Sequence, residues 1–104
     1  MIIVSSTAGV NVPHVGDHGT IMYSASKAAA HHLARNLAVE LGPRNITTNT
    51  VAPGFFPSKL ADGLIEILGG KDDLEKSNPR GRLGIPEDIA GVMIFLASPV
   101  ASYM

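Results

Sequence analysis

The chain has 104 residues, of which 45% are hydrophobic and 16% charged, with a formal net charge of −1 and no cysteine. This length allows one small domain, and the hydrophobic content with a mean hydropathy of +0.22 excludes a disordered chain. The near-zero charge argues against a nucleic acid or an acidic membrane surface as partner, and the absence of cysteine excludes disulfides and thiolate metal sites.

The first predicted element is a buried strand over residues 2–6, where three aliphatic residues precede two serines. A loop rich in glycine, proline and histidine is expected over residues 7–21. The histidines lack the spacing of metal ligands, so no metal is predicted at any of them: His14, His18, His31 and His32. We predict no signal peptide, and no membrane span, because the longest apolar run, residues 89–97, is far shorter than the ~20 residues such a helix needs.

The second element is a long alanine-rich helix over residues 22–41, which ends at a Gly-Pro pair. Tyr23 and Lys27 are four residues apart in this helix and therefore lie one turn apart on one face. A free phenol titrates near ~10, but a neighbouring ammonium favours the phenolate and makes a tyrosine a usable proton donor and acceptor. Alone, the pair also fits an exposed tyrosine and a solvated lysine on an ordinary helix.

A second strand is predicted over residues 46–51, with a turn at Pro53 and Gly54. Because a helix separates it from the first strand, the two strands are expected to be parallel, as in a βαβ unit. A two-stranded sheet leaves both of its edges unpaired. We therefore expect the chain to be poorly stable alone or to assemble with a partner.

Three helical segments are predicted in the second half of the chain. Ser58 is the expected N-cap of a helix that ends at Leu68, before two glycines. A helical turn is expected over residues 72–76. The last helix is expected over residues 86–98, with a proline in its first position and two acidic residues in its first turn.

Four segments, in this order along the chain, resemble the short-chain dehydrogenase/reductase family. Four matches in the expected order make the resemblance specific, and it spans residues 2 to about 103. They are Ser5-Ser6-Thr7-Ala8-Gly9, Tyr23-Ser24-Ala25-Ser26-Lys27, Asn49-Thr50-Val51-Ala52-Pro53-Gly54, and Gly81-Arg82-Leu83-Gly84-Ile85-Pro86-Glu87-Asp88-Ile89-Ala90.

The resemblance covers only the second half of a typical family member. The family's glycine-rich turn, T-G-x-x-x-G-x-G, and its N-N-A-G segment have no counterpart in the sequence. The implied fold is α/β: residues 1–104 form a single partial domain, the C-terminal portion of a Rossmann-like doubly wound parallel sheet. The N-terminal nucleotide-binding half and the last strand would be lacking. A fragment, a truncated gene model and one half of a split protein all fit this pattern.

The resemblance implies an NAD(P)-dependent oxidoreductase that acts on a carbonyl or a secondary alcohol. Ser6 would hydrogen-bond the carbonyl oxygen, Tyr23 would transfer the proton, and Lys27 would lower the pKa of Tyr23 and bind the nicotinamide ribose. Each role has a structural alternative. Ser6 could be a serine that satisfies backbone groups at the end of a strand, and Pro53 could belong to an ordinary turn. The implied cofactor contacts are Tyr23, Lys27, Pro53, Gly54, Phe56 and Ser58, with Phe56 standing where the family usually has isoleucine or valine.

The cofactor is expected to be NAD or NADP, with NADP favoured, in a cytoplasmic protein that forms homo-oligomers in its full-length form. The helix from Ser58 to Leu68 corresponds to the family's substrate lid, and its apolar face favours a fairly apolar small-molecule substrate. His14 or Asp17 could line the substrate cleft. The pattern is closest to 3-oxoacyl-(acyl-carrier-protein) reductases. The alternative is a non-catalytic remnant that acts as an association module.

Overall fold

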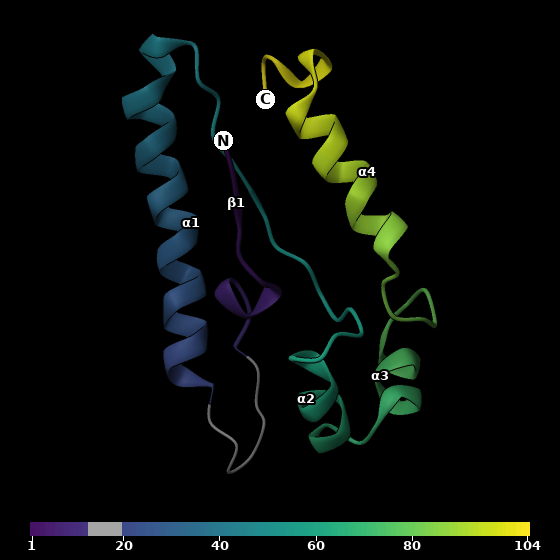
Figure 1. Ribbon diagram of the computed structural model, residues 1–104. Coiled ribbons are helices and arrows are strands. Elements are labelled where there is room, and N and C mark those ends of the chain that lie inside the picture. Colours follow the sequence, from purple (N-terminus) through teal and green to yellow (C-terminus); the bar gives the residue numbers. More distant parts are fainter. Residues whose placement is uncertain (13–19) are drawn as a thin grey trace.

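The computed structural model describes residues 1–12 and 20–104 (Figure 1). His14, Asp17 and His18, considered above as cleft or metal residues, lie outside the described residues. The helices and strands of the described parts follow the expected order. They are β1 (Ile2–Val4), α1 (Ile21–Leu41), β2 (Asn49–Val51), α2 (Ala61–Ile67), α3 (Lys71–Ser77) and α4 (Pro86–Ala97), with 3-10 turns η1 (Thr7–Gly9), η2 (Gly42–Arg44) and η3 (Pro99–Ala101).

The two strands pair in parallel, as predicted, with Ile2 opposite Asn49 and Val4 opposite Val51. Each strand is shorter than expected. The predicted second strand starts at residue 46, but the pairing begins at Asn49, opposite Ile2. The first strand stops at Val4 because Ser6 already caps the turn η1 through its side chain.

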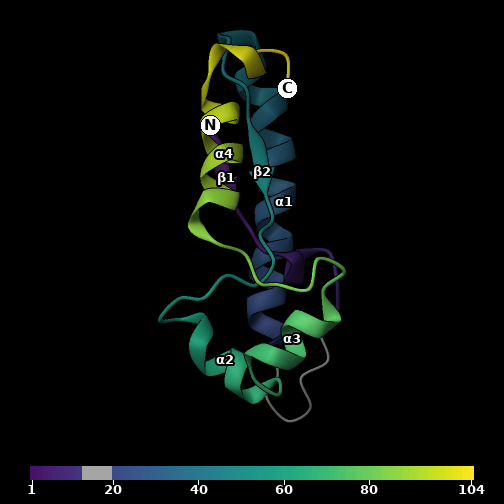
Figure 2. The same cartoon turned by 90° about the vertical axis from the view of Figure 1, so that its right-hand side faces the viewer.

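The sheet lies between two helical layers, with α1 on one face and α4 on the other (Figures 1 and 2). The turn η1 packs closely on α1. A Cβ atom on Gly9 would lie 2.8 Å from Cδ2 of His31 and 2.9 Å from the carbonyl carbon of Lys27, so only glycine fits there. Ser5 also donates a hydrogen bond of 2.8 Å to the Lys27 carbonyl oxygen. These contacts fix the end of β1 against the start of α1.

The buried apolar core of the described residues is small and consists of Ala34, Ile65, Leu83 and Ala101. Many large apolar side chains are instead exposed, among them Val4 at 49% and Ile94 at 70%. In the parallel pairing, alternate residues of a strand bond to its neighbour, and the Ser5 amide donates to Val51, so the Ile2 and Val4 backbone groups face away from β2. The sheet edge and the exposed apolar surface agree with the expectation that this chain lacks neighbours it is built to contact.

Helices α2 and α3 form a separate pair beside the sheet (Figure 2). The helix α2 begins at Ala61 with Leu60 as its N-cap, so the prediction of Ser58 as the N-cap is wrong. The Ser58 hydroxyl instead accepts a hydrogen bond of 3.0 Å from the Ala61 amide and closes the turn before the helix. Gly69 and Gly70 then connect α2 to α3 with φ angles of 102° and 91°, a conformation that favours glycine.

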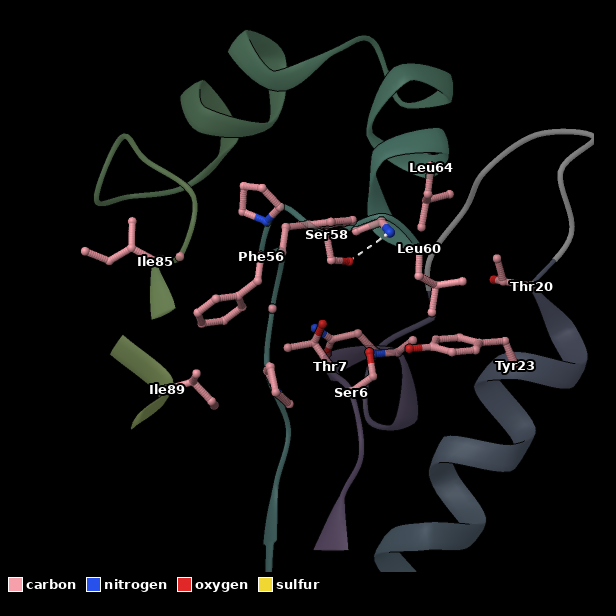
Figure 3. Close-up of a pocket in the computed structure, with 18 of the residues that line it drawn as sticks. Ser6, Thr7, Thr20, Tyr23, Phe56, Ser58, Leu60, Leu64, Ile85 and Ile89 are labelled. Carbon is pink, nitrogen blue, oxygen red and sulfur yellow. Dashed lines mark hydrogen bonds between the residues drawn. The ribbon is translucent and has the colours of Figure 1, made fainter. Parts of the chain in front are cut away.

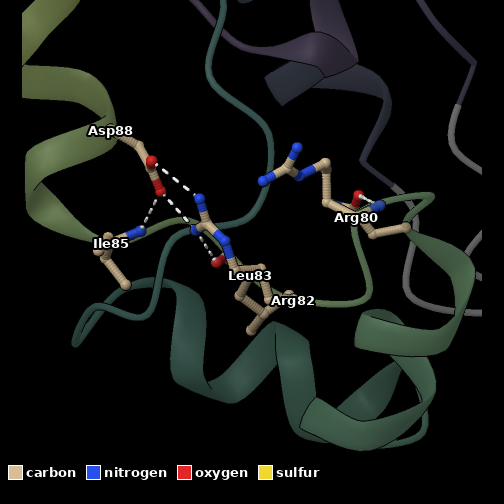
Figure 4. A network of polar contacts seen from close by, with 6 residues as sticks. Arg80, Arg82, Leu83, Ile85 and Asp88 are labelled. Atoms are coloured by element: carbon tan, nitrogen blue, oxygen red, sulfur yellow. Dashed lines mark hydrogen bonds and ion pairs between the residues drawn. The ribbon is translucent and has the colours of Figure 1, made fainter.

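An ion pair stiffens the turn that begins α4 (Figure 4). The guanidinium of Arg82 contacts both carboxylate oxygens of Asp88, at 2.6 and 3.0 Å, and also donates to the Leu83 carbonyl at 3.0 Å. Asp88 in turn accepts a hydrogen bond of 2.9 Å from the Ile85 amide. The Arg82 hydrogen bond, followed by that of the Ile85 amide, holds the pKa of Asp88 well below its usual value.

We expect the variant Asp88→Asn to be less stable than the unaltered chain at neutral pH but not in acid. A carboxyl group whose folded pKa is depressed contributes stability above its unfolded pKa of about 4, and the contribution is lost as the pH falls towards the folded pKa. Thermal unfolding of both proteins between about pH 7 and about pH 2 measures this difference. A stability difference that stayed constant over this range would contradict the assignment.

Candidate active site

One large groove opens at the carboxyl ends of the two strands, where open parallel sheets bind ligands (Figure 3). Its volume is about 960 Å³. It is formed by the turn η1, the first residues of α1, the loop between β2 and α2, α2 itself and the start of α4. The lining residues are Ser6, Thr7, Ala8, Asn11, Thr20, Tyr23, Pro53, Gly54, Phe55, Phe56, Pro57, Ser58, Leu60, Ala61, Leu64, Gly84, Ile85, Pro86 and Ile89.

Ser6 and Tyr23 both line this groove, and the tyrosine side chain extends from α1 towards the serine (Figure 3). The Ser6 hydroxyl oxygen accepts a hydrogen bond of 3.1 Å from the Ala8 amide. That bond uses an acceptor site and leaves the hydroxyl hydrogen available for a second partner. Ser6 can therefore cap the turn η1 and still donate a hydrogen bond to a substrate oxygen. Tyr23 is 45% exposed, so its phenol is accessible from the groove.

Lys27 does not line the groove but lies beside the tyrosine. Its Nζ atom is 5.5 Å from the centre of the Tyr23 ring, within the range of a cation–π contact. The same atom is 3.5 Å from the carbonyl oxygen of Val4, at the outer limit of a hydrogen bond. The ammonium thus lies over the tyrosine ring and has no short hydrogen bond among the described residues.

The other residues expected to contact a cofactor, Pro53, Gly54, Phe56 and Ser58, all line the groove. Sequence reasoning did not single out the polar side chains Asn11 and Thr20. Their position in the loop after a parallel strand was the available signal. It also missed Ile85 and Ile89, which belong to a helix start far along the chain and have no local pattern that would indicate a groove.

Within residues 1–12 and 20–104, no helix is long and apolar enough to cross a membrane. No group of three or more histidine, aspartate or glutamate side chains in the same ranges is arranged to hold a metal ion.

A parallel βαβ unit with a groove at the carboxyl ends of its strands is typical of a Rossmann-like α/β fold. The family model described as "Enoyl-(Acyl carrier protein) reductase" matches residues 1–104, and the chain belongs to the short-chain dehydrogenase/reductase family. This confirms both the recognised family and the expected fold class.

Curated relatives are considerably longer than this chain. It is 40% identical over 94 residues to the short-chain reductase protein NovJ of Streptomyces niveus, covering 86% of this chain and 36% of that protein. It is 38% identical over 104 residues to the 3-oxoacyl-[acyl-carrier-protein] reductase FabG of Aquifex aeolicus, covering 100% of this chain and 40% of that protein. The chain therefore spans about two-fifths of the length of these relatives.

Solved structures give the same proportion. The Pseudomonas aeruginosa RhlG/NADP active-site complex matches with a TM-score of 0.85 and 36% identity over 99% of this chain and 39% of that one. An oxidoreductase of the short-chain dehydrogenase/reductase family from Burkholderia thailandensis matches with a TM-score of 0.86 and 29% identity, again over 99% and 39%.

Proposed function

We propose that this chain is the catalytic and substrate-binding portion of an NAD(P)-dependent carbonyl reductase. The observation that supports this most directly is the shared groove of Ser6 and Tyr23, with Lys27 beside the tyrosine ring. The remaining part of the domain, which the relatives have and this chain does not span, would supply most of the cofactor-binding surface. Residues 1–104 then form one partial domain.

The roles of the three side chains follow from their chemistry. The nicotinamide cofactor supplies the hydride when bound. The Ser6 hydroxyl donates a hydrogen bond to the substrate carbonyl oxygen and stabilises the negative charge that develops there. Tyr23 gives its phenolic proton to the same oxygen, and the ammonium of Lys27 stabilises the phenolate that remains.

The groove residues fit a nicotinamide cofactor in part. Pro53, Gly54, Phe56, Ser58 and Tyr23 line a space large enough for a nicotinamide and a small substrate together. Lys27 lies beside this space and not in its lining, with its ammonium 5.5 Å from the centre of the Tyr23 ring and 3.5 Å from the Val4 carbonyl oxygen. We propose NADP as the cofactor, because a similar solved structure is described as an NADP complex.

The substrate is proposed to be a fairly apolar carbonyl compound. Apolar side chains make up most of the groove lining, among them Phe55, Leu64 and Ile89, and Leu60, just before α2, is 87% exposed. Several of the most similar relatives are named 3-oxoacyl-[acyl-carrier-protein] reductases, which supports a 3-oxoacyl group as the substrate class. A cytoplasmic homo-oligomer remains our prediction for the full-length form.

A second function, a non-catalytic association module, is supported by the exposed apolar residues of the outer helices. Val39 on α1 is 79% exposed, and Ile94 on α4 is 70% exposed. Such surfaces mark contacts with other proteins. They are compatible with either function, so the decision rests on cofactor binding.

The two functions are separated by a titration with NADPH of an extended protein. In this protein, the parts of the Aquifex aeolicus reductase that flank the matched region are joined to the present chain. We expect saturable NADPH binding, which Lys27→Ala weakens along with turnover because the lysine contacts the ribose and supports the tyrosine. An extended protein that folds but binds no NADPH would favour the association module.

A further inference from the structure

The loop between β2 and α2 contacts the start of α4 through an aromatic ring and a glycine. A Cβ atom built on Gly84 would lie 2.7 Å from Cδ1 of Phe56 and closer still to two other ring atoms. The backbone conformation of Gly84 is not left-handed, so the ring and not the main chain excludes a side chain there. The ring of Phe56 therefore lies directly on the backbone of the glycine.

A backbone hydrogen bond accompanies this contact. The Gly84 amide donates to the Phe55 carbonyl oxygen at 3.0 Å. On the far side of Gly84, the turn is rigid because Arg82 and Asp88 are joined by two hydrogen bonds and Leu83 is only 6% exposed. The loop is thus attached to a turn that an ion pair and a buried leucine hold in place.

Three backbone hydrogen bonds anchor this loop among the described residues. The first ties Pro53 to Thr7 of η1 at 3.1 Å, and the last ties Ser58 to Asp62 of α2 at 2.8 Å. The bond at Phe55 is the one between them. Because the loop has no helix or strand of its own, the Phe56–Gly84 contact determines where its middle lies relative to the groove.

We propose that Phe56 is a positioning residue of the reductase site: seated on Gly84, its ring holds the Pro53–Ser58 loop in the conformation that binds the cofactor. This inference rests on the proposed function. The family usually has isoleucine or valine at this position, which lack a flat ring to cover the glycine. In this chain the larger ring of Phe56 packs on residue 84 and holds the loop there. The ring fits only because residue 84 has no side chain.

The test is a double-mutant cycle with Gly84→Ala, Phe56→Val and the combined variant, made in the 104-residue chain and in the extended protein. Gly91→Ala is the matched control, because a Cβ atom there meets nothing within 4 Å. Thermal unfolding and amide exchange at residue 84 report on the contact in both proteins. NADPH affinity is measured in the extended protein.

We expect Gly84→Ala to expel the ring, speed amide exchange at residue 84 and weaken NADPH binding by about tenfold to a hundredfold, since small displacements of binding groups are costly. Phe56→Val alone should weaken NADPH binding to a similar degree, because it removes the ring that holds the loop. The combined variant should bind no more weakly than either single variant, since all three lose the same contact. Gly91→Ala should stay within about twofold, as expected of a substitution away from any contact.

The outcomes decide between distinct conclusions. NADPH affinity that stays unchanged in Gly84→Ala or in Phe56→Val overturns the positioning role and leaves the proposed function intact. A combined variant whose losses add also overturns it, because the two residues would then act independently. If Gly84→Ala does not fold, Phe56→Val, which introduces no collision, decides: weakened NADPH binding in the folded variant supports the proposal, and unchanged binding overturns it. Absence of NADPH binding in the unaltered extended protein overturns the proposed function and this inference together.

Discussion

In the extended protein, replacing Tyr23 with phenylalanine should lower the turnover number by about a hundredfold to ten-thousandfold, the range of a lost general acid. The substitution removes a single hydroxyl group and leaves the ring in place. Tyr23 lines the groove from α1 and extends towards Ser6, so the substitution removes the proposed proton donor from the groove (Figure 3). Steady-state assays of NADPH oxidation with a 3-oxoacyl substrate measure the effect.

Cofactor affinity should stay nearly unchanged in the Tyr23→Phe variant, because the transferable proton is not needed for binding. Tyr103→Phe is the matched control, since this tyrosine is fully exposed at the other end of the chain. Its turnover should equal that of the unaltered protein. Full turnover in Tyr23→Phe would show that the tyrosine is not the general acid, whether or not cofactor affinity changes.

The pairing of the two strands could be predicted because it depends on local patterns. Each strand is a short apolar run, and the long helix between them leaves parallel pairing as the natural arrangement. The strand ends could not be predicted from these runs. They depend on where the partner strand begins and on the turn that Ser6 caps, and neither is a property of the apolar run itself.

The convergence of Ser6 and Tyr23 could also be predicted, since both follow from matched motifs at the carboxyl end of the sheet. The position of Lys27 could not. It shares a helix face with Tyr23, but a long flexible side chain has many conformations, and in this structure the ammonium lies against the tyrosine ring and the outward-facing carbonyl of Val4. Helical spacing determines the face and not the direction in which the side chain leaves it.

The contact between Phe56 and Gly84 is a different kind of omission. Gly84 belongs to the last matched segment and Phe56 follows the third, but the two residues are 28 positions apart and nothing in either segment indicates that they touch. The unusual phenylalanine was visible in the sequence as a departure from isoleucine or valine. The contact that this phenylalanine makes becomes evident only when the structure places its ring on Gly84.

The 104-residue chain alone should show no measurable reductase activity, whereas the extended protein should turn over at a rate typical of enzymes, on the order of 1–10³ s⁻¹. Hydride transfer requires the nicotinamide to be held against the substrate, and the chain spans only 40% of the Aquifex aeolicus relative, without a glycine-rich nucleotide-binding turn. The outward backbone groups of Ile2 and Val4 and the small buried core argue in the same direction.

The background for this measurement is the same chain carrying Tyr23→Phe, so that contaminating reductases in the preparation are counted equally in both samples. Circular dichroism of the short chain separates an unfolded protein from a folded but incomplete one. If the short chain oxidised NADPH well above its Tyr23→Phe background, the groove alone would be sufficient to position the cofactor. The extended protein should be active because a neighbouring strand then covers the outer edge of β1, and the added half of the domain holds the nicotinamide over a groove whose proton donor is already in place.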